Sequence, residues 1–96
     1  MISVKVHSIL GIKKILGRGD LEFSVPEGFT LKSLLSMMVR NYGEGLSSLL
    51  YGANGTDILP HIRLIVNGRD VEFLKGLETS LNEGDEVLIL PPISGG

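Results

Sequence analysis

The residues of this sequence that are best suited to chemistry lie at its C-terminal end, in Pro91-Pro92-Ile93-Ser94-Gly95-Gly96. The paired prolines favour an extended polyproline conformation, which holds the tail away from the folded body. Gly95 and Gly96 have no side chains, so they form a narrow, flexible end that can enter a tight channel. The reactive group of such a tail is the α-carboxylate of Gly96.

A carboxylate is a poor electrophile, but adenylation by ATP would give the Gly96 carbonyl a good leaving group, AMP. Attack by sulfide would then produce a thiocarboxylate, and attack by an amine would produce an isopeptide bond. On this interpretation the protein carries a group and does not itself catalyse a reaction. Two alternatives are a frayed end with glycines by chance and an interaction module without an activated end.

Other constellations of reactive side chains are scarce in the sequence. It has no cysteine, and its two histidines, His7 and His61, are not at metal-ligand spacing, so we predict no metal site. We interpret both histidines as surface strand residues. The segment Gly11–Gly19 lacks the Gly-Lys-Ser/Thr ending of a phosphate loop. Asp85 and Glu86 are interpreted as solvated turn residues with no partner base.

Composition limits the classes of partner. The chain of 96 residues corresponds to one domain, and its net charge of −2 provides no basic excess for nucleic acid. Its apolar runs are much shorter than the roughly 20 residues of a membrane-spanning helix. No signal peptide is visible, so we expect a cytoplasmic protein that does not bind membranes.

Alternation of apolar and polar residues predicts the strands that must position the tail. The first two predicted strands form a hairpin, and Asn67-Gly68 is a strong signal for a second one. The connection between the first two strands, Gly11–Gly19, is interpreted as an irregular segment ending in a turn. The predicted strands span residues 2–7, 20–25, 62–66, 71–73 and 87–90.

One helix is predicted between the hairpins. Thr30 is a plausible N-cap, apolar residues recur at helical spacing over residues 31–42, and Gly43 ends the pattern. Residues 46–51 could form a short helical turn, and residues 52–57 are interpreted as an exposed loop. Three leucines are assigned to a loop or 3₁₀ segment covering the edge of the core: Leu74, Leu77 and Leu81.

The element order is therefore β, β, α, β, β, β. The first and last strands are the most apolar, so we expect them side by side at the centre of a mixed sheet of four to five strands. One main helix would pack across one face. This α+β layout is the ubiquitin-like β-grasp, with a domain over residues 1–92 and a flexible tail over residues 93–96.

The strand pattern also predicts a surface beside the tail. Inward residues in the third and last strands leave Arg63, Ile65, Leu88 and Leu90 pointing outward. These residues predict an exposed apolar patch with a cationic neighbour, which is typical of a protein-binding surface. The alternative is that residues 43–60 fold over this face and cover it.

The ending Gly84-Asp85-Glu86-Val87, followed by Pro91-Pro92-Ile93-Ser94-Gly95-Gly96, resembles the small subunit of molybdopterin synthase, a ubiquitin-like sulfur carrier. In that family a Gly-Asp-Glu-Val turn leads into the last strand, and Pro-Pro-Val-Ser-Gly-Gly closes the chain. Val66-Asn67-Gly68 also resembles the family's third strand and turn. The motifs cover the last third of the chain, and the order of elements matches nearly all of it.

The resemblance implies that an E1-like, ubiquitin-activating-type enzyme uses ATP to adenylate Gly96, which then receives sulfur as a thiocarboxylate. The tail would enter the large subunit of molybdopterin synthase and give sulfur to precursor Z, forming the molybdopterin dithiolene. Gly95 would fit the channel, and Pro91, Pro92, Ile93 and Ser94 would line the insertion. The carrier itself would bind no cofactor. In the family the exposed sheet face contacts both partners.

The sequence also departs from this family. His7-Ser8-Ile9-Leu10 replaces the usual Phe-Ala-x-Leu-Arg stretch, and the chain is longer, mostly through residues 11–19 and 43–60. The thiamine sulfur carrier is usually shorter and lacks the diproline. A carrier for tRNA thiolation, a carrier for tungsten cofactor synthesis and a ubiquitin-like protein modifier remain alternatives.

Overall fold

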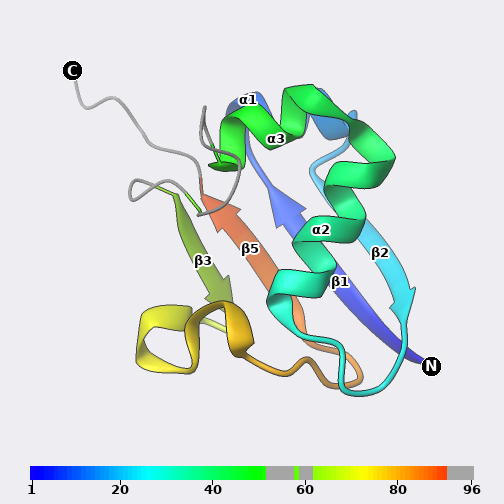
Figure 1. The fold of residues 1–96 in the computed structure, drawn as a ribbon, viewed down its shortest axis with the longest axis vertical. Coiled ribbons are helices and arrows are strands. Elements are labelled where there is room, and N and C mark those ends of the chain that lie inside the picture. Colours follow the sequence, from blue (N-terminus) through cyan, green and yellow to red (C-terminus); the bar gives the residue numbers. More distant parts are fainter. Residues whose placement is uncertain (52–57, 59–61, 91–96) are drawn as a thin grey trace.

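The computed structural model of the protein describes residues 1–51, 58 and 62–90, and within them one mixed sheet forms the centre of the fold (Figure 1). Its strand order is β2-β1-β5-β3-β4, so the last of the described strands in the chain is the middle strand of the sheet. The strands are β1 (Ile2–Ser8), β2 (Asp20–Val25), β3 (Arg63–Val66), β4 (Arg69–Asp70) and β5 (Glu86–Leu90).

The first and last strands lie side by side, as predicted. β1 and β5 are parallel, whereas β1–β2, β3–β5 and β3–β4 are antiparallel. The alternation that predicted these strands gives the inner face its core residues, because every second side chain points to that face. Val4, Val6, Val87 and Ile89 are almost completely buried there.

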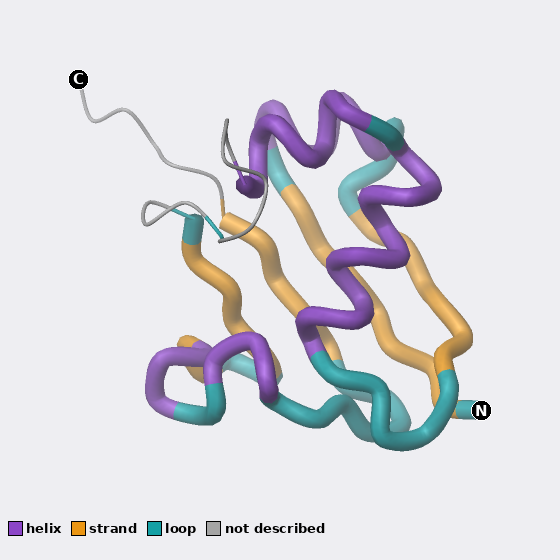
Figure 2. Tube along the Cα trace, in the orientation of Figure 1, coloured by secondary structure: helices purple, strands orange, loops and turns teal. Residues whose placement is uncertain are grey.

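The long helix α2 (Leu31–Tyr42) crosses the inner face of the sheet (Figure 2). Its N-cap is Thr30, as predicted, whose side-chain oxygen accepts a hydrogen bond from the Ser33 backbone N–H at 3.2 Å. Gly43 follows the last turn with φ at +82°, a conformation that glycine adopts without strain. The predicted apolar stripe is buried against the sheet: Leu31, Leu34, Leu35 and Met38.

Two further helices complete the helical layer, and the second of them along the chain packs against both the first and α2. The helical turn expected near residue 46 is the helix α3 (Glu44–Tyr51), which buries Leu46 and Leu50. The prediction of an irregular Gly11–Gly19 connection was wrong, because this segment contains most of the helix α1 (Leu10–Leu16). Ile12 and Leu16, one helical turn apart, are both buried, so tertiary packing stabilises a helix that is too short to be stable alone.

The predicted fourth strand at residues 71–73 was also wrong. The hairpin turn at Asn67-Gly68 is correct, with both residues at positive φ, but β4 ends at Asp70. The Asp70 side chain accepts a hydrogen bond from the Glu72 backbone N–H at 2.9 Å, and this contact caps a 3₁₀ turn, η1 (Val71–Phe73).

A second 3₁₀ turn, η2 (Gly76–Glu78), and the chain after it close the edge of the core, as predicted. Leu81 is buried, and its backbone N–H donates to the Phe29 carbonyl at 2.8 Å. The sheet, the helix across it and the central parallel pair confirm the α+β, ubiquitin-like β-grasp layout. Across the residues that the structure describes, every helix falls short of the length and apolar character that a membrane span requires.

Candidate functional site

The four residues predicted to point outward come together on the outer face of β3 and β5. Ile65 lies directly opposite Leu88, and Arg63 lies opposite Leu90 in the antiparallel register. Ile65, Leu88 and Leu90 are each partly exposed, whereas the residues between them on each strand are buried. We call Ile65, Leu88 and Leu90 the apolar patch.

The helical layer does not cover this patch. α3, which forms most of the described part of segment 43–60, buries Leu46 and Leu50 in the core and packs against α1 and α2 on the inner face (Figure 1). The alternative that this helix folds over the outer face is therefore wrong for residues 44–51. The role of the patch in binding a partner stays a prediction.

The patch adjoins the place where the tail begins, because β5 ends at Leu90. The six tail residues predicted to carry and insert the reactive end lie outside the described residues, and so does His61. Their roles stay predictions from the sequence. The tail residues are Pro91, Pro92, Ile93, Ser94, Gly95 and Gly96.

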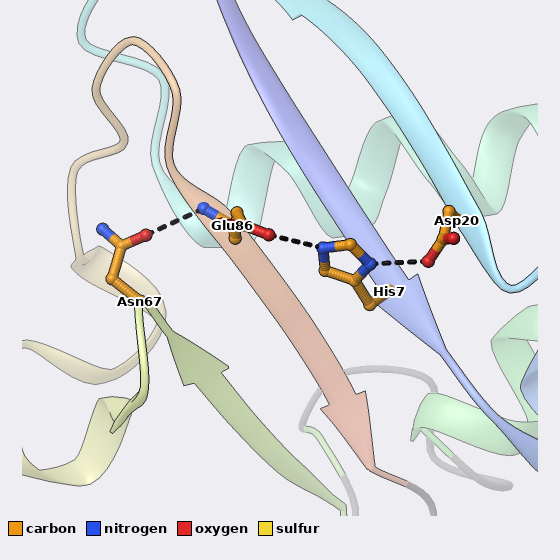
Figure 3. A network of polar contacts seen from close by, with 4 residues as sticks. All are labelled: His7, Asp20, Asn67 and Glu86. Atoms are coloured by element: carbon orange, nitrogen blue, oxygen red, sulfur yellow. Dashed lines mark hydrogen bonds and ion pairs between the residues drawn. The ribbon is translucent and has the colours of Figure 1, made fainter.

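On its β1 side, the patch is bordered by a polar network that extends across three strands (Figure 3). His7 of β1 is in register with Leu88, and its ring lies between two carboxylates. The His7 Nδ1 atom is 2.6 Å from an Asp20 carboxylate oxygen on β2, and its Nε2 atom is 2.8 Å from a Glu86 carboxylate oxygen on β5. The network therefore connects β2, β1 and β5 through side chains as well as through the backbone ladder.

The two carboxylates favour the charged imidazolium form of His7. Hydrogen bonds from the ring to Asp20 and to Glu86 raise the pKa of His7 above its ordinary 6.5. The same contact lowers the pKa of the Asp20 carboxyl below its ordinary 3.8. Only the protonated ring can donate from both nitrogens at once, so protonation is what makes the bridge complete.

Glu86 and Asp85 differ from their predicted description as solvated turn residues without a partner base. Glu86 is the first residue of β5 and pairs with His7. Asp85 is buried, and its carboxylate accepts hydrogen bonds from the Asn67 side-chain amide and from the Asn82 backbone N–H, each at 2.8 Å. Asn67 thus does more than form a turn, because its side-chain oxygen also accepts the Glu86 backbone N–H at 2.9 Å (Figure 3).

On the β3 side of the patch, Arg63 forms an ion pair with Asp70. The Asp70 carboxylate accepts from two guanidinium nitrogens of Arg63, at 2.9 and 3.2 Å. A backbone hydrogen bond from Glu72, and then this pairing with Arg63, lower the pKa of the Asp70 carboxyl. The ion pair holds a cation beside Leu90 and leaves much of the guanidinium side chain exposed to a partner.

The His7 network makes stability depend on pH with a definite sign. Because folding raises the pKa of His7, its contribution to the free energy of unfolding is complete below pH 6.5 and disappears as pH rises through the folded-state value. Because folding lowers the pKa of Asp20, its contribution is present above pH 3.8 and disappears as pH falls through the folded-state value. The network therefore stabilises most between these two ordinary values.

We predict that His7→Gln destabilises the protein more at about pH 5 than at about pH 8. Urea unfolding of the variant and of the unchanged protein, at both pH values, measures the difference in the free energy of unfolding at each pH. Lys5→Gln, an exposed position on the same strand and face, is the control and should show no such pH dependence. Equal destabilisation at both pH values would contradict the stabilising role of the protonated ring.

The amino-acid sequence is similar to a known protein family and to several characterised relatives. The ThiS family matches residues 11–96, which includes the diglycine end. The sulfur carrier protein CysO of Mycobacterium tuberculosis is 37% identical, covering 99% of this chain and 98% of that relative. Small archaeal modifier protein 3 of Haloferax volcanii is 30% identical, covering 88% of each chain.

A solved structure agrees with the sequence relatives. Small archaeal modifier protein 1 of Methanosarcina acetivorans superimposes with a TM-score of 0.79 at 29% identity, covering 100% of this chain and 98% of that chain. These similarities extend over the whole β-grasp and are not confined to the motifs near the tail. The chain belongs to the ThiS family of ubiquitin-like β-grasp proteins, among relatives named as sulfur carriers and as protein modifiers.

Proposed function

We propose that the protein is a sulfur carrier that holds sulfur on Gly96 as a thiocarboxylate. The observation that carries this proposal is that the family match runs through residue 96 and so includes the diglycine. In the sequence, that diglycine follows the last residues of a central strand and a diproline, an order that favours a narrow end beyond an extended segment. The similarity to a sulfur carrier over nearly the whole chain supports the same function.

The proposed chemistry has two steps on the partner enzymes. In an E1-like activating enzyme, a Gly96 carboxylate oxygen attacks the α-phosphorus of ATP, the bond to the β-phosphate breaks, and pyrophosphate leaves. Sulfide sulfur then attacks the carbonyl carbon of the acyl adenylate, and AMP leaves with the electrons of the broken C–O bond. The product is the Gly96 thiocarboxylate, and no redox step is needed.

The apolar patch would dock both partners in turn. Partly exposed apolar side chains grouped beside the tail support a protein-binding surface. A partner that covers Ile65, Leu88 and Leu90 would hold β5, and the tail that follows Leu90 would enter its channel. Arg63, held by Asp70 with most of its side chain exposed, would supply a cation at the rim of the contact. One surface for two partners implies that they bind one after the other.

For the enzyme that accepts the sulfur, we propose the large subunit of molybdopterin synthase, which would pass it to precursor Z. The resemblance of residues 84–87 and 91–96 to the small subunit of that enzyme supports this choice. A protein-modifier function is the second candidate, and the similarity to small archaeal modifier protein 3 favours it. In that case an amine would attack the same acyl adenylate, and the product would be an isopeptide bond.

The mass of the intact protein after incubation with ATP, an E1-like activating enzyme and a sulfur donor tests the carrier function. We expect the mass to increase by the exchange of one oxygen for one sulfur, located at Gly96 by fragmentation. A reaction without ATP is the control, because no adenylate forms in it. An unchanged mass with an enzyme that activates a known carrier would exclude the carrier function, and an adduct on lysine side chains would favour the modifier.

We predict that Ile65→Asp weakens binding to the activating enzyme by about 2 kcal/mol, or about thirtyfold in Kd, without unfolding the protein. The reason is that Ile65 is outward and partly exposed, so a charge there is solvated in the free protein and is buried only in the complex. Isothermal titration calorimetry measures the affinity, and circular dichroism checks the fold.

Ser24→Asp is the matched control for Ile65→Asp. Ser24 lies on β2 at the far edge of the same outer face, so it adds the same charge away from the apolar patch. We expect this control to bind normally. Equal loss of affinity in both variants would show that net charge governs binding, and loss of the fold in Ile65→Asp would show that the face is covered.

A further inference from the structure

A groove on the helical side of the molecule has a composition that the sulfur chemistry does not explain. It runs between α2 and α3 and has a volume of about 430 Å³. Lys32 and Arg40 of α2 line it, together with the hydroxyl groups of Ser36, Ser47 and Tyr51. Figure 1 shows α2 and α3 on one side of the sheet, whereas the apolar patch is on the other face, so a groove between these helices lies on the side away from the patch.

The charge of the groove is opposite to that of the whole chain. The protein has a net charge of −2, yet the groove has two cations and, among the described residues, no carboxylate in its lining. Neither Lys32 nor Arg40 forms an ion pair within the described part of the chain. In the lining formed by the described residues, the two cations have only hydroxyl-bearing and apolar neighbours, a setting that attracts anionic groups.

The hydroxyl groups add hydrogen-bonding capacity to these cations. Burial raises the pKa of the Tyr51 phenol, while its hydrogen bond with Ser36 acts in the opposite direction. Tyr51 therefore keeps its proton at neutral pH and can donate to an acceptor, as Ser36 and Ser47 also can. Val39 and Leu77 provide apolar contact in the same groove.

The spacing of the two cations selects the shape of the ligand. Lys32 and Arg40 are eight residues apart in one helix, which separates their Cα atoms by about 12 Å along its axis. A ligand with two anionic groups at a similar separation can pair with both cations while each cation stays over its own turn of the helix. In an extended peptide, residues four apart point to the same side and are separated by about 13 Å. The residue midway between them points the same way, toward the middle of a groove whose lining includes the apolar side chains of Val39 and Leu77.

Other ligand classes agree less well with the groove. Nucleic-acid affinity increases with the number of phosphates neutralised, and two cations on an acidic protein neutralise few. A small molecule usually has most of its surface buried, but Lys32, Ser36 and Arg40 are all exposed. A membrane surface attracts a protein by about 1 kcal/mol for each basic residue, so two provide little.

We infer that the groove between α2 and α3 binds an extended acidic segment of a partner protein, with the pattern acidic-x-apolar-x-acidic. The two acidic side chains pair with Lys32 and Arg40, and the apolar side chain contacts Val39 and Leu77. The segment binds on the side opposite the apolar patch, so it can remain bound while the outer face docks an enzyme. This inference is independent of the proposed sulfur chemistry.

The test is an NMR titration of the full chain with a short synthetic peptide containing Glu-x-Leu-x-Glu. We expect saturable shifts of backbone amides in α2 and α3, no such shifts with a Gln-x-Leu-x-Gln peptide, and weaker binding as salt is raised. Charge reversal, Lys32→Glu with Arg40→Glu, should weaken binding about tenfold or more, since each exposed ion pair is replaced by repulsion. Lys32→Gln with Arg40→Gln provides a second variant that perturbs the helix less.

The matched control is Lys14→Glu with Arg69→Glu, which changes the net charge equally at exposed positions away from the groove. We expect it to bind the peptide nearly as well as the unchanged protein. Equal loss in the control would overturn the inference in favour of bulk charge. Competition by inorganic phosphate at the peptide's own concentration would overturn it in favour of a small oxyanion site, and absence of shifts in α2 and α3 would overturn it outright.

Discussion

Replacing Gly96 with alanine, or extending the chain by one alanine after Gly96, is expected to reduce thiocarboxylate formation by about 100-fold or more. Under the proposed function, the alanine methyl group would widen an end that enters a narrow channel, and the extension would move the carboxylate one residue beyond the position from which it attacks ATP. Both changes leave the core untouched, because they lie beyond β5. Intact mass after reaction with the activating enzyme measures the yield.

A change of the same size outside the tail serves as the control for Gly96. Ser24→Ala lies at an exposed position on β2 and should give the normal yield. Binding of each tail variant to the activating enzyme should stay within about threefold, since the apolar patch is intact. Normal thiocarboxylate yield in either tail variant would contradict the proposal that Gly96 carries the sulfur, whatever the affinity.

The second large effect is expected from the core, where Leu35→Ala should lower the free energy of unfolding by about 2–5 kcal/mol. Leu35 is completely buried in α2 against the sheet, so removing its side chain leaves a cavity that the neighbouring residues fill only in part. Alanine favours helices at least as strongly as leucine, so the loss comes from packing and not from helix propensity. Domains of this size have about 5–15 kcal/mol in total, so the loss is a substantial part of the stability.

Urea unfolding followed by circular dichroism measures the loss at Leu35. Lys32→Ala is the control on the same helix, because Lys32 is exposed and its removal should change stability by only about 0.5 kcal/mol. If Leu35→Ala lost no more stability than this control, the helix would not be packed on the sheet as the structure has it. Where Leu35→Ala is folded, we expect its thiocarboxylate yield to be normal, because the substitution lies in the core and not in the tail.

The parts of the fold that the sequence predicts well are those where a residue pattern and its tertiary environment agree. The apolar stripe of α2 begins after Thr30 and ends at Gly43, and all three signals are local. α1 has weaker local signals. Gly17 ends it in the left-handed conformation, but Gly11 is its second residue, and its N-cap, Ile9, provides no side-chain hydrogen bond. It forms because Ile12 and Leu16 reach the core, a fact that only the assembled fold contains.

The fourth strand shows how an alternating pattern can mislead. Val71 and Phe73 flank the polar Glu72, which is the pattern of a half-buried strand. In the structure Val71 is buried but Phe73 is 86% exposed, because the Asp70 cap turns the chain into η1. The hydrogen bond from the Glu72 backbone N–H to the Asp70 side chain favours the 3₁₀ turn over continued strand pairing.

On the outer face, too, local patterns predicted some features correctly, and contacts between distant residues could not be predicted. Period-two alternation places Ile65, Leu88 and Leu90 outward, and the structure brings them together there. The pairing of His7 with Asp20 and Glu86 could not be predicted, because it depends on the register of β1 with β2 on one side and with β5 on the other. Residues 7 and 86 are far apart in sequence, and parallel register is not fixed by a tight turn.

The central position of β5 has a consequence for how the protein is made. β5 is the last described strand to be synthesised, yet it lies between β1 and β3, so neither half of the sheet can join the other before it emerges from the ribosome. Long-range parallel pairing of this kind forms late and slowly. A chain interrupted before residue 86 would lack both the middle of its sheet and its tail. Completion of the fold and presentation of the tail are therefore linked during synthesis, and incomplete chains would be left to proteolysis instead of competing for the partner enzymes.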